Sequence, residues 1–397
     1  MINGKKILIL GGSNFQIPVI KRAKELGLQV ITCDYLPNNP GHQYSDEYVN
    51  VSTVDKAAVL SVAEKMNIDA IITLSSDPAI PTVAYVAEQM GLPGPAQKAV
   101  SVLSEKNLFR SLLKKAGLPV PKYFVLDSEK IPDEIAYASC NFIVKPVDSC
   151  GSKGITFAPE NSFALANAVR LALDHSRSKK CIIEEYIDGD QIHGDGYVQD
   201  GKLIYHYLGD HVFYTNTRNF IPISTRWPCK YGAGVLEDIV AQVEDVSRHA
   251  GYMDGPVNIE ARITPAGNYI VEVAPRNGGN YVPIIQQHLT GFNFVDRIIH
   301  DALGVTGPLP DSLPKKKVGA HYILHAQKEG VFHGVSISPE IKEKIFFHKI
   351  FKVKGDAVFE YVGSHTTIGV ALLEFASVSE RDQLMGEIDN LIKVEIS

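Results

Sequence analysis

The alternation of strand and helix patterns over residues 5–95 constrains the fold more than any other feature. The apolar runs KILIL, LQVITC and DAIITL are typical of buried strands. Between and after them, Phe15–Leu26, Asp55–Met66 and Pro78–Met90 have the spacing of helices. Strands that alternate with helices in this way predict an open, mainly parallel α/β sheet.

Such a sheet binds ligands at the carboxyl ends of its strands. A dinucleotide fingerprint there would need GxGxxG, but Ser13 and Gln16 occupy the second and third glycine positions counted from Gly11. The pattern disfavours NAD and leaves two interpretations, a tight strand-to-helix turn or a site for a small polar substrate. The candidate residues at this edge are Gly11, Gly12, Ser13, Asp34, Ser75, Ser76 and Asp77.

Composition excludes several classes of function. A net charge of −6 over 397 residues argues against a general nucleic-acid footprint. No apolar run reaches the roughly 18 residues of a membrane span, and the start MINGKKILIL lacks the features of a signal peptide. The cysteines form no CxxC pair, which predicts a reduced, cytoplasmic protein without a zinc cluster. They are Cys33, Cys140, Cys150, Cys181 and Cys229.

The stretch FIVKPVDSCGSKGI combines an apolar strand, a lysine and a glycine loop. Lys145 ends the strand, and Gly151 and Gly154 lie in the loop that follows. In the Walker pattern GxxxxGK the lysine follows the glycines, so this loop is of another kind. Cys150 is interpreted as a small loop residue rather than a nucleophile, because no His/Asn arrangement can be assigned to it. Residues 98–117 predict one helix with Lys106 inside it.

The rest of the chain predicts antiparallel strands and a small C-terminal module. A helix over Ser162–Asp174 and the strand CIIEEYI precede antiparallel strands with a hairpin turn at Asp200-Gly201. Prolines 308, 310 and 314 mark a linker to a small β-rich module closed by a helix over Ser379–Ile392. The predicted domains are residues 1–97, residues 98–307 and residues 308–397.

Two glutamates on a late hairpin are the most informative pair. The segments VNIEARI and YIVEVAP are joined by the turn TPAGN. If Ile263 faces Tyr269, Glu260 lies directly opposite Glu272, because strand faces alternate. Like charges opposite each other destabilise a sheet, and a bound Mg²⁺ would relieve them. The alternative is that both face solvent or pair with arginine. In this register the shared face holds Asn258, Glu260, Arg262, Ile270, Glu272 and Ala274.

Arg276 follows this hairpin and precedes Asn277 and two glycines. Its planar guanidinium suits a carboxylate or a phosphoryl group, although an ion-pair role explains it equally well. The stretch before Pro228 is a weaker prediction for a substrate pocket, with Tyr207, His211, Tyr214, Arg218 and Arg226. Four histidines are interpreted as surface or core residues, because they are not spaced from carboxylates or cysteines as metal ligands would be. They are His211, His288, His321 and His325.

The lysine and glycine loop, the acidic pair of EEYI, and the two hairpin glutamates followed by PR occur in that order. This ordered set resembles the ATP-grasp superfamily, in particular the carboxylate–amine ligases and the carbamoyl-phosphate-synthetase-like proteins. The resemblance covers nearly the whole chain. It implies a fold with a pre-ATP-grasp domain, the grasp domains with a lid at about residues 120–190, and a small C-terminal β-rich module.

The resemblance also implies the positions that bind ATP. Lys106 and Lys145 would contact the phosphates, and the glycine loop would fold over them with its N–H groups toward oxygen. Glu184 would meet the adenine amino group, and Ile187 would offer its backbone to the ring. Many members have a glutamate for the ribose where this chain has Gln191 or the nearby His193. The full set is Lys106, Lys145, Gly151, Ser152, Lys153, Gly154, Glu184, Glu185, Ile187, Gln191 and His193.

The remaining implied roles concern metal and substrates. Glu260 and Glu272 would hold Mg²⁺, with Mn²⁺ as a substitute, and Arg276 and Lys145 would be catalytic. Many members have an asparagine where this chain has Ala274, a departure that looks like the formate-dependent glycinamide ribonucleotide transformylase branch. Asn258 faces the same way and could supply the missing oxygen. The substrate positions are Arg276, Asn277, Gly278, Gly12, Ser13 and Asp77.

The function implied is an ADP-forming ligase that joins a small carboxylic acid, such as an amino acid, to an amine through an acyl phosphate. Two alternatives stay open, a bicarbonate- or formate-activating enzyme and a non-catalytic ATP-binding regulatory protein. The expected partners are a small-molecule carboxylate and an amine, with neither nucleic acid nor membrane. A homodimer is implied by the resemblance only.

Overall fold

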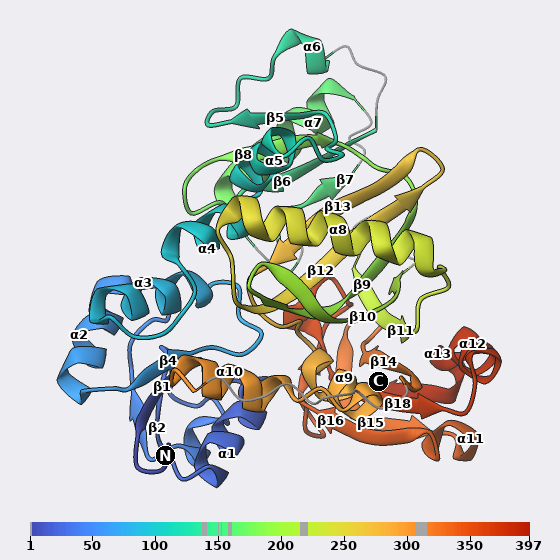
Figure 1. Ribbon diagram of the computed structural model, residues 1–397. Helices are drawn as coiled ribbons and strands as arrows, with labels where there is room; N and C mark the ends of the chain where they lie inside the picture. Colours follow the sequence, from blue (N-terminus) through green and yellow to red (C-terminus); the bar gives the residue numbers. More distant parts are fainter. Residues whose placement is uncertain are drawn as a thin grey trace.

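The computed structural model describes residues 2–136, 141–149, 151, 153–157, 161–214, 221–305 and 316–397. Several predictions fall outside these ranges, namely those on Cys140, Cys150, Ser152, Arg218 and the linker prolines. Figure 1 shows an N-terminal lobe, a lid at the far end of the molecule, and a large sheet that joins them to the C-terminal residues. Within the described ranges, no helix combines the length and apolar character needed to cross a membrane.

The N-terminal lobe is the predicted parallel sheet. Its strands are β1 (Lys6–Leu10), β2 (Gln29–Cys33), β3 (Glu47–Val49) and β4 (Ala70–Ile72), in the order β3-β2-β1-β4. One face is covered by α2 (Lys56–Met66) and α3 (Ile80–Met90). The other is covered by α1 (Ile17–Glu25) and α10 (Phe294–Ala302). Thus a helix from far along the chain completes the N-terminal core.

The prediction of one helix over residues 98–117 is wrong. The structure has α4 (Gln97–Ser104) and α5 (Lys106–Lys115), separated by Glu105 in an extended conformation with φ −101° and ψ 116°. The Lys106 backbone N–H donates to the Val147 carbonyl oxygen at 3.0 Å. A tertiary hydrogen bond therefore satisfies a donor at the start of α5, and helical periodicity along the chain could not reveal it.

The lid is a four-stranded antiparallel sheet in the order β5-β8-β6-β7. Helix α7 (Ser162–His175) packs on it and begins at Asn161, whose side chain accepts a hydrogen bond from the Ala164 N–H. A short helix, α6 (Asp133–Ala136), lies at the tip. The strands are β5 (Tyr123–Leu126), β6 (Phe142–Pro146), β7 (Thr156–Phe157) and β8 (Cys181–Glu185).

The largest sheet has eight strands in the order β13-β12-β9-β10-β11-β14-β18-β16. It runs without a break from the middle of the chain into the C-terminal residues, so both regions share one sheet. Helix α8 (Ala233–Ala250) packs on one face near β13, and α9 (Val282–Thr290) packs near β14. The strands are β9 (Asp190–Gln199), β10 (Lys202–Phe213), β11 (Pro222–Trp227), β12 (Gly255–Thr264), β13 (Gly267–Ala274), β14 (Val318–Leu324), β16 (Ile345–Ile350) and β18 (Gly369–Phe375).

The C-terminal region adds a small sheet, β17-β15-β19. The predicted helix over Ser379–Ile392 is divided at Glu387 into α12 (Val378–Gly386) and α13 (Ile388–Leu391), and its last residue, Ile392, begins a strand. That strand, β19 (Ile392–Ile396), has the apolar alternation of IKVEI and pairs with β15 (Gly330–Ile337). The other elements here are β17 (Ala357–Val358), α11 (Pro339–Lys342) and the 3₁₀ turn η2 (Ser364–Thr366).

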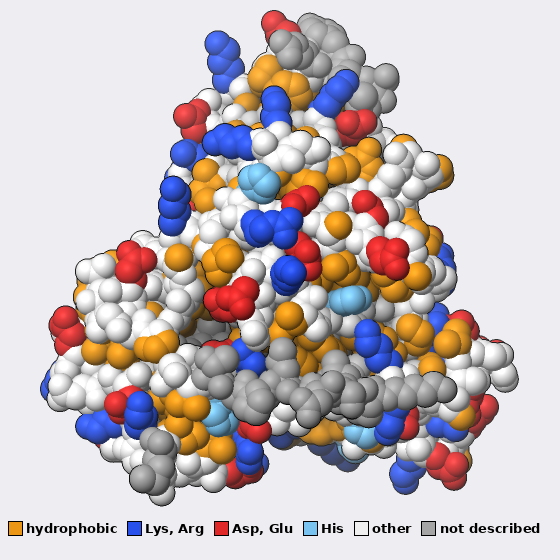
Figure 2. All heavy atoms as spheres, in the orientation of Figure 1, with side chains coloured by type: hydrophobic (Ala, Val, Ile, Leu, Met, Phe, Trp, Pro, Cys, Tyr) orange, Lys and Arg blue, Asp and Glu red, His pale blue; other side chains and the backbone are white. Residues whose placement is uncertain are grey.

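On the face shown in Figure 2, the described Lys and Arg side chains are interspersed with Asp and Glu. This mixture agrees with the modest net charge of −6. Apolar side chains between them lie in small, separate groups. The features that carry chemistry are therefore sought inside the molecule.

Candidate active site

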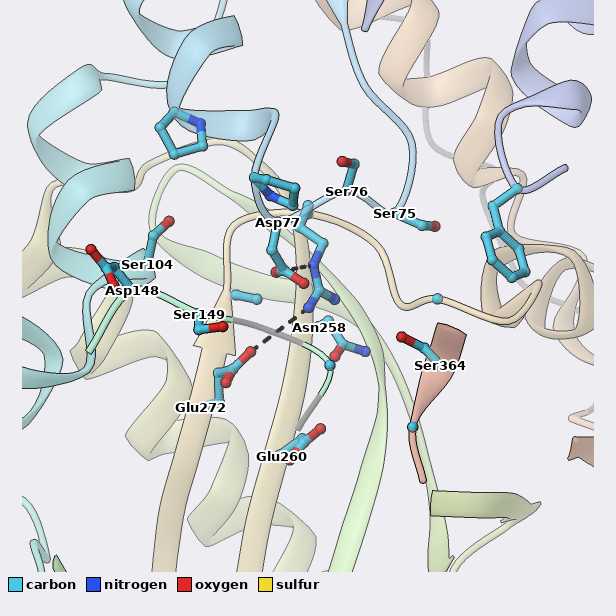
Figure 3. A pocket seen from close by; sticks show the side chains of 18 of the residues that line it. Ser75, Ser76, Asp77, Ser104, Asp148, Ser149, Asn258, Glu260, Glu272 and Ser364 are labelled. Carbon is cyan, nitrogen blue, oxygen red and sulfur yellow. Dashed lines mark hydrogen bonds and ion pairs between the residues drawn. The ribbon is translucent and has the colours of Figure 1, made fainter. Parts of the chain in front are cut away.

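A cavity of about 850 Å³ lies where the lid, the N-terminal sheet and the eight-stranded sheet meet. Each region contributes to its wall: Asp77 from the N-terminal lobe, Lys145 from the lid, and Glu260 from the large sheet. Ser364, in the C-terminal η2 turn, closes a further side. Figure 3 shows these walls converging, with the two glutamates on neighbouring strands.

Glu260 on β12 lies directly opposite Glu272 on β13, as predicted. The premise of that prediction was wrong, however, because Arg262 and not Ile263 lies opposite Tyr269. The register shifts between Glu260 and Ala261, so Val271 has no opposite residue and forms a bulge. Ile270 consequently lies opposite Ala261 in the core and does not share the glutamate face.

The glutamate pair carries negative charge that its neighbours balance only in part. Burial, and next the charge of Glu272, raise the pKa of Glu260 to about 7. Gln191 Nε2 donates to Glu260 Oε2 at 2.8 Å, and Arg276 Nη2 lies 3.7 Å from Glu272 Oε1. Two converging carboxylates fit Mg²⁺, which takes one or two protein carboxylates and completes its shell with water and phosphate oxygens.

The described residues contain no group of three or more His, Cys, Asp and Glu side chains arranged to hold a metal. The two glutamates therefore suit an ion that phosphate oxygens complete, rather than a closed protein site. Asn258, predicted to add an oxygen, lines the cavity beside them. Its Nδ2 donates to Asp195 Oδ1 at 2.8 Å.

Lys145 belongs to a buried cluster on the lid side. Its Nζ lies 2.7 Å from Glu184 Oε2, and Arg110 Nε lies 2.8 Å from Glu184 Oε1. Burial alone would raise the pKa of Glu184, but the charges of Arg110 and Lys145 outweigh it and hold the pKa at about 2. Burial lowers the pKa of Lys145 more than the Glu184 charge raises it. Glu184 thus fixes the orientation of the Lys145 and Arg110 side chains by pairing with both of them.

Arg110 is a site residue that the sequence reasoning missed. It lies on α5 four positions after Lys106, so both share one helix face, and this spacing could have identified it. Its Nη1 donates at 2.9 Å to the carbonyl oxygen of Val271, the bulge residue beside Glu272. Arg110 therefore connects the Lys145–Glu184 pair to β13, the strand that carries Glu272.

The second lysine and the glycine loop lie at the cavity edge. Lys106 Nζ donates to the Ser149 carbonyl oxygen at 2.8 Å. Gly151 and Gly154 have φ of 67° and 71°, which only glycine adopts without strain. A Cβ on Gly151 would lie 2.9 Å from Ser364 Oγ, so the loop approaches the C-terminal η2 turn closely.

Arg276 is held by the N-terminal lobe. Its Nε lies 2.5 Å from Asp77 Oδ1, and its Nη1 donates to the Asn277 carbonyl oxygen at 3.0 Å. Asp77, predicted to bind substrate, is therefore the partner that orients Arg276. Both residues line the cavity. The guanidinium remains close to Glu272, where it can meet an anion bound beside that carboxylate.

Asp195 on β9 is a second residue that the sequence reasoning missed. It is fully buried and accepts from the Gly278 N–H at 2.7 Å and from Asn277 Nδ2 at 3.2 Å. Burial raises its pKa to about 6. Asn277 and Gly278 are thus packed against β9, behind the cavity lining, where they support the loop that starts at Arg276.

The predicted positions divide into two groups. Those that line the cavity are Lys106, Lys145, Gly151, Gln191, His193, Glu260, Glu272, Arg276, Ser13 and Asp77, together with Gly11, Asp34, Ser75 and Ser76 from the ends of the parallel strands. Those described positions that lie outside its lining are Lys153, Gly154, Glu184, Glu185, Ile187, Asn277, Gly278 and Gly12. Gly12 donates its N–H to Asp34 Oδ2, and a Cβ there would lie 2.2 Å from the His42 ring.

A family model described as an ATP-grasp domain matches residues 138–283. A formate-dependent phosphoribosylglycinamide formyltransferase from Sulfurisphaera tokodaii is 26% identical over 346 residues, which is 82% of either chain. Several other curated relatives match over only about half of their own length, so the chain spans about half of those proteins.

Solved structures share the fold along the whole chain. An L-amino acid ligase from Bacillus licheniformis has a TM-score of 0.81 with 23% identity, covering 100% of both chains. The biotin carboxylase domain of the 2-oxoglutarate carboxylase from Hydrogenobacter thermophilus, solved with MgADP, ADP and bicarbonate, has a TM-score of 0.77 with 18% identity, covering 99% of this chain and 91% of that one. Residues 138–283 thus match the ATP-grasp domain family, and the whole chain shares the fold of these solved structures.

Proposed function

We propose that this protein is an ADP-forming ligase that joins a carboxylic acid to an amine through an acyl phosphate. The observation that carries the proposal is the meeting of the opposed Glu260 and Glu272 with Lys145, Lys106 and Arg276 around one cavity. Carboxylates for a cation, together with cations for phosphate, are the groups that phosphoryl transfer requires.

In the first step, a carboxylate oxygen of the acid attacks the γ-phosphorus of ATP, and the bond to the ADP oxygen breaks. Mg²⁺ held by Glu260 and Glu272 would neutralise charge on the phosphate oxygens. Lys145 and Lys106 would position those oxygens, because Glu184 orients the first and Ser149 the second. Arg276, oriented by Asp77, would hold the acid carboxylate or the transferred group.

In the second step, the amine nitrogen attacks the acyl carbon, the bond to phosphate breaks, and the nitrogen loses a proton. Acyl phosphates react with water, so the cavity must exclude water between the two steps. The close approach of Gly151 to Ser364 supports a role of the glycine loop and the η2 turn in this closure.

The test measures ADP and phosphate release from Mg²⁺-ATP with a panel of carboxylic acids and amines, added alone and in pairs. Release is expected to require one acid–amine pair and to fall at least about 100-fold in Glu272→Ala, because oriented charge contributes on this order. ATP affinity is measured in parallel by titration. Background release with every pair, while ATP still binds, would contradict a ligase and favour a binding-only protein.

A second candidate is activation of formate or bicarbonate by the same first step. It is favoured by the similarity to formate-dependent phosphoribosylglycinamide formyltransferases and by Ala274 on the hairpin. Both small acids therefore belong in the panel. ADP release that depends on formate or bicarbonate, and that larger acids do not support, would establish this candidate in place of the first.

A further inference from the structure

Three histidines from different strands line the same cavity beyond the glutamate pair: His193 on β9, His211 on β10 and His321 on β14. His193 and His211 stack with ring centroids 4.5 Å apart. Among the described residues they form no metal-holding group. The rings also offer hydrogen bonds to the cavity.

The neighbours determine where each imidazole carries its proton. The Thr225 backbone N–H lies 3.1 Å from His321 Nδ1 and can only donate, so His321 Nδ1 accepts and the proton of the neutral ring is on Nε2. Gln191 Nε2 donates to Glu260 and lies 3.1 Å from His211 Nδ1. His211 Nδ1 therefore accepts as well, and its proton is also on Nε2.

His193 differs from the other two rings because both of its nitrogens are used. Asn258 Nδ2, which also donates to Asp195, lies 2.9 Å from His193 Nε2, and Thr225 Oγ1 lies 2.9 Å from its Nδ1. No described residue accepts from His211 Nε2 or from His321 Nε2. Neither Nε2 is among the buried side-chain atoms that lack a partner, so both donors reach the cavity, where a ligand can accept from them.

The rings are uncharged. Burial, and then the charge of His321, lower the pKa of His211 to about 3. Burial, and then the charge of His193, lower the pKa of His321 to about 3. The charge of Arg262 lowers the pKa of His211 further. At neutral pH the pair thus presents two neutral N–H donors.

The walls around this pair are apolar or already hydrogen-bonded. Phe213 lies with its ring centroid 4.8 Å from that of His211. Ile221 and Tyr361 line the same part of the cavity, and the Tyr361 hydroxyl donates to the Pro222 carbonyl oxygen at 2.8 Å. Within the described residues, the pair offers neutral donors beside these apolar side chains, which suits an uncharged acceptor in an otherwise apolar group.

We propose that His211 and His321 form a subsite for an uncharged hydrogen-bond-accepting group, such as an amide carbonyl, on the carboxylic acid substrate. The subsite rests on the proposed function and lies next to its chemistry, because Gln191 bridges Glu260 and His211 at 2.8 and 3.1 Å. An acid whose carboxylate lies near Glu272 and Arg276 would extend its remaining group to these rings.

The N–H donors of His211 and His321 should discriminate between carboxylic acids of similar size by the side-chain group that each acid brings to the subsite. An ammonium group has only donors and cannot pair with N–H donors. A carboxylate would bury a charge against two neutral donors, because Arg262 already donates to the Tyr186 hydroxyl and the Gly189 carbonyl oxygen. An alkyl group would leave both donors unpaired, at a cost of at least about tenfold in affinity.

The test uses near-isosteric amino acids as the acid and hydroxylamine as a general amine, which converts an acyl phosphate into a hydroxamate and phosphate. L-asparagine, L-aspartate and L-leucine form one set, and L-glutamine, L-glutamate and L-methionine form another. We expect the amide of a set to exceed both isosteres by at least about tenfold in kcat/KM. In His211→Phe and His321→Phe this preference should fall toward unity, while the apolar isostere still reacts.

The matched control is His288→Phe, since His288 pairs with Glu374 and stacks on Phe346 outside the cavity lining. It should keep the wild-type preference. A wild-type preference for the apolar or the acidic isostere, or a preference that survives both cavity variants, would overturn the subsite.

A second measurement separates the subsite from the ligase chemistry and needs no variant to fold. In wild-type protein with Mg²⁺-ADP, the imidazole ¹⁵N signals of His211 and His321 should report protons on Nε2 at neutral pH. They should shift on titration with L-asparagine or L-glutamine. If the ¹⁵N signals shift with an acid but no hydroxamate forms, the ligase proposal alone is contradicted. If the protons are on Nδ1, or if none of the acids shifts the signals, the subsite is contradicted.

Discussion

The lid and the eight-stranded sheet each bury carboxylates beside the cavity, but they balance the charge differently. On the lid side, Glu184 lies between two cations, Lys145 and Arg110, at 2.7 and 2.8 Å. On the sheet side, Glu260 lies opposite a second carboxylate, Glu272. The pKa of Glu184 is held at about 2, whereas that of Glu260 is raised to about 7.

The two clusters illustrate two different uses of a carboxylate inside a protein. A carboxylate between two cations is a scaffold, and removing it leaves both cations buried without compensation. A carboxylate opposite another carboxylate is costly in the protein alone and becomes favourable when a cation binds between them. Variants of each cluster should therefore change stability in opposite directions.

The largest effect is expected from Glu184→Ala on the lid side. Because it leaves Lys145 and Arg110 unpaired in a buried site, the free energy of unfolding should fall by about 3–5 kcal/mol. Urea unfolding at neutral pH measures it. Glu185→Ala, at the neighbouring half-buried position, is the control and should change it by less than about 0.5 kcal/mol. A similar loss in both variants would remove the special role of Glu184.

The same carboxylate predicts a pH dependence. Its folded pKa of about 2 lies below the ordinary value of 4.5, so its contribution to stability is full above pH 4.5 and is lost as the pH falls toward 2. The difference in unfolding free energy between wild type and Glu184→Gln should be constant above pH 4.5 and shrink below it. A difference that grows on acidification would contradict the ion-paired assignment.

A smaller effect of opposite sign is expected from Glu260→Gln on the sheet side. In protein freed of divalent metal by EDTA, removing one of two opposed charges should raise the free energy of unfolding by about 1 kcal/mol at neutral pH. Gln keeps an acceptor for Gln191. Added Mg²⁺ with ADP should stabilise wild type more than the variant.

The control for this variant is Glu237→Gln on the exposed side of α8, which should change the stability by less than about 0.5 kcal/mol. If Glu260→Gln destabilises the metal-free protein by as much as Glu184→Ala does, the two clusters are alike. The contrast between them would then fail.

The smallest effect on stability is expected from Lys106→Met, because this half-buried lysine has only the Ser149 carbonyl oxygen as a partner within the described residues. The free energy of unfolding should change by less than about 1 kcal/mol, while ATP affinity falls about tenfold through loss of a phosphate contact. Lys114→Met, exposed on the same helix, should leave both unchanged. Unaltered ATP affinity in Lys106→Met would remove this lysine from the site.

Local pattern predicted the parts of the site that lie on single elements. Strand alternation along VNIEARI and YIVEVAP placed Glu260 opposite Glu272, although the assumed turn register was wrong and the Val271 bulge corrects it. Arg110 could have been found from its position four residues after Lys106. Asp195 carried no such signal, since its role depends on a loop that returns from beyond β13.

The sequence by itself determined the parallel N-terminal sheet, the hairpin carboxylates, the lysine before its glycine loop, and a resemblance to the ATP-grasp superfamily. These follow from short-range periodicity and spacing, which the chain carries locally. Only the tertiary structure decided the pairing of Lys145 with Glu184, the support of Arg276 by Asp77, and the meeting of His211 with His321. Each of these contacts joins elements that are far apart in the chain, and local sequence patterns do not encode such contacts. The contacts nevertheless determine the charge or the proton position of the groups that they bring together.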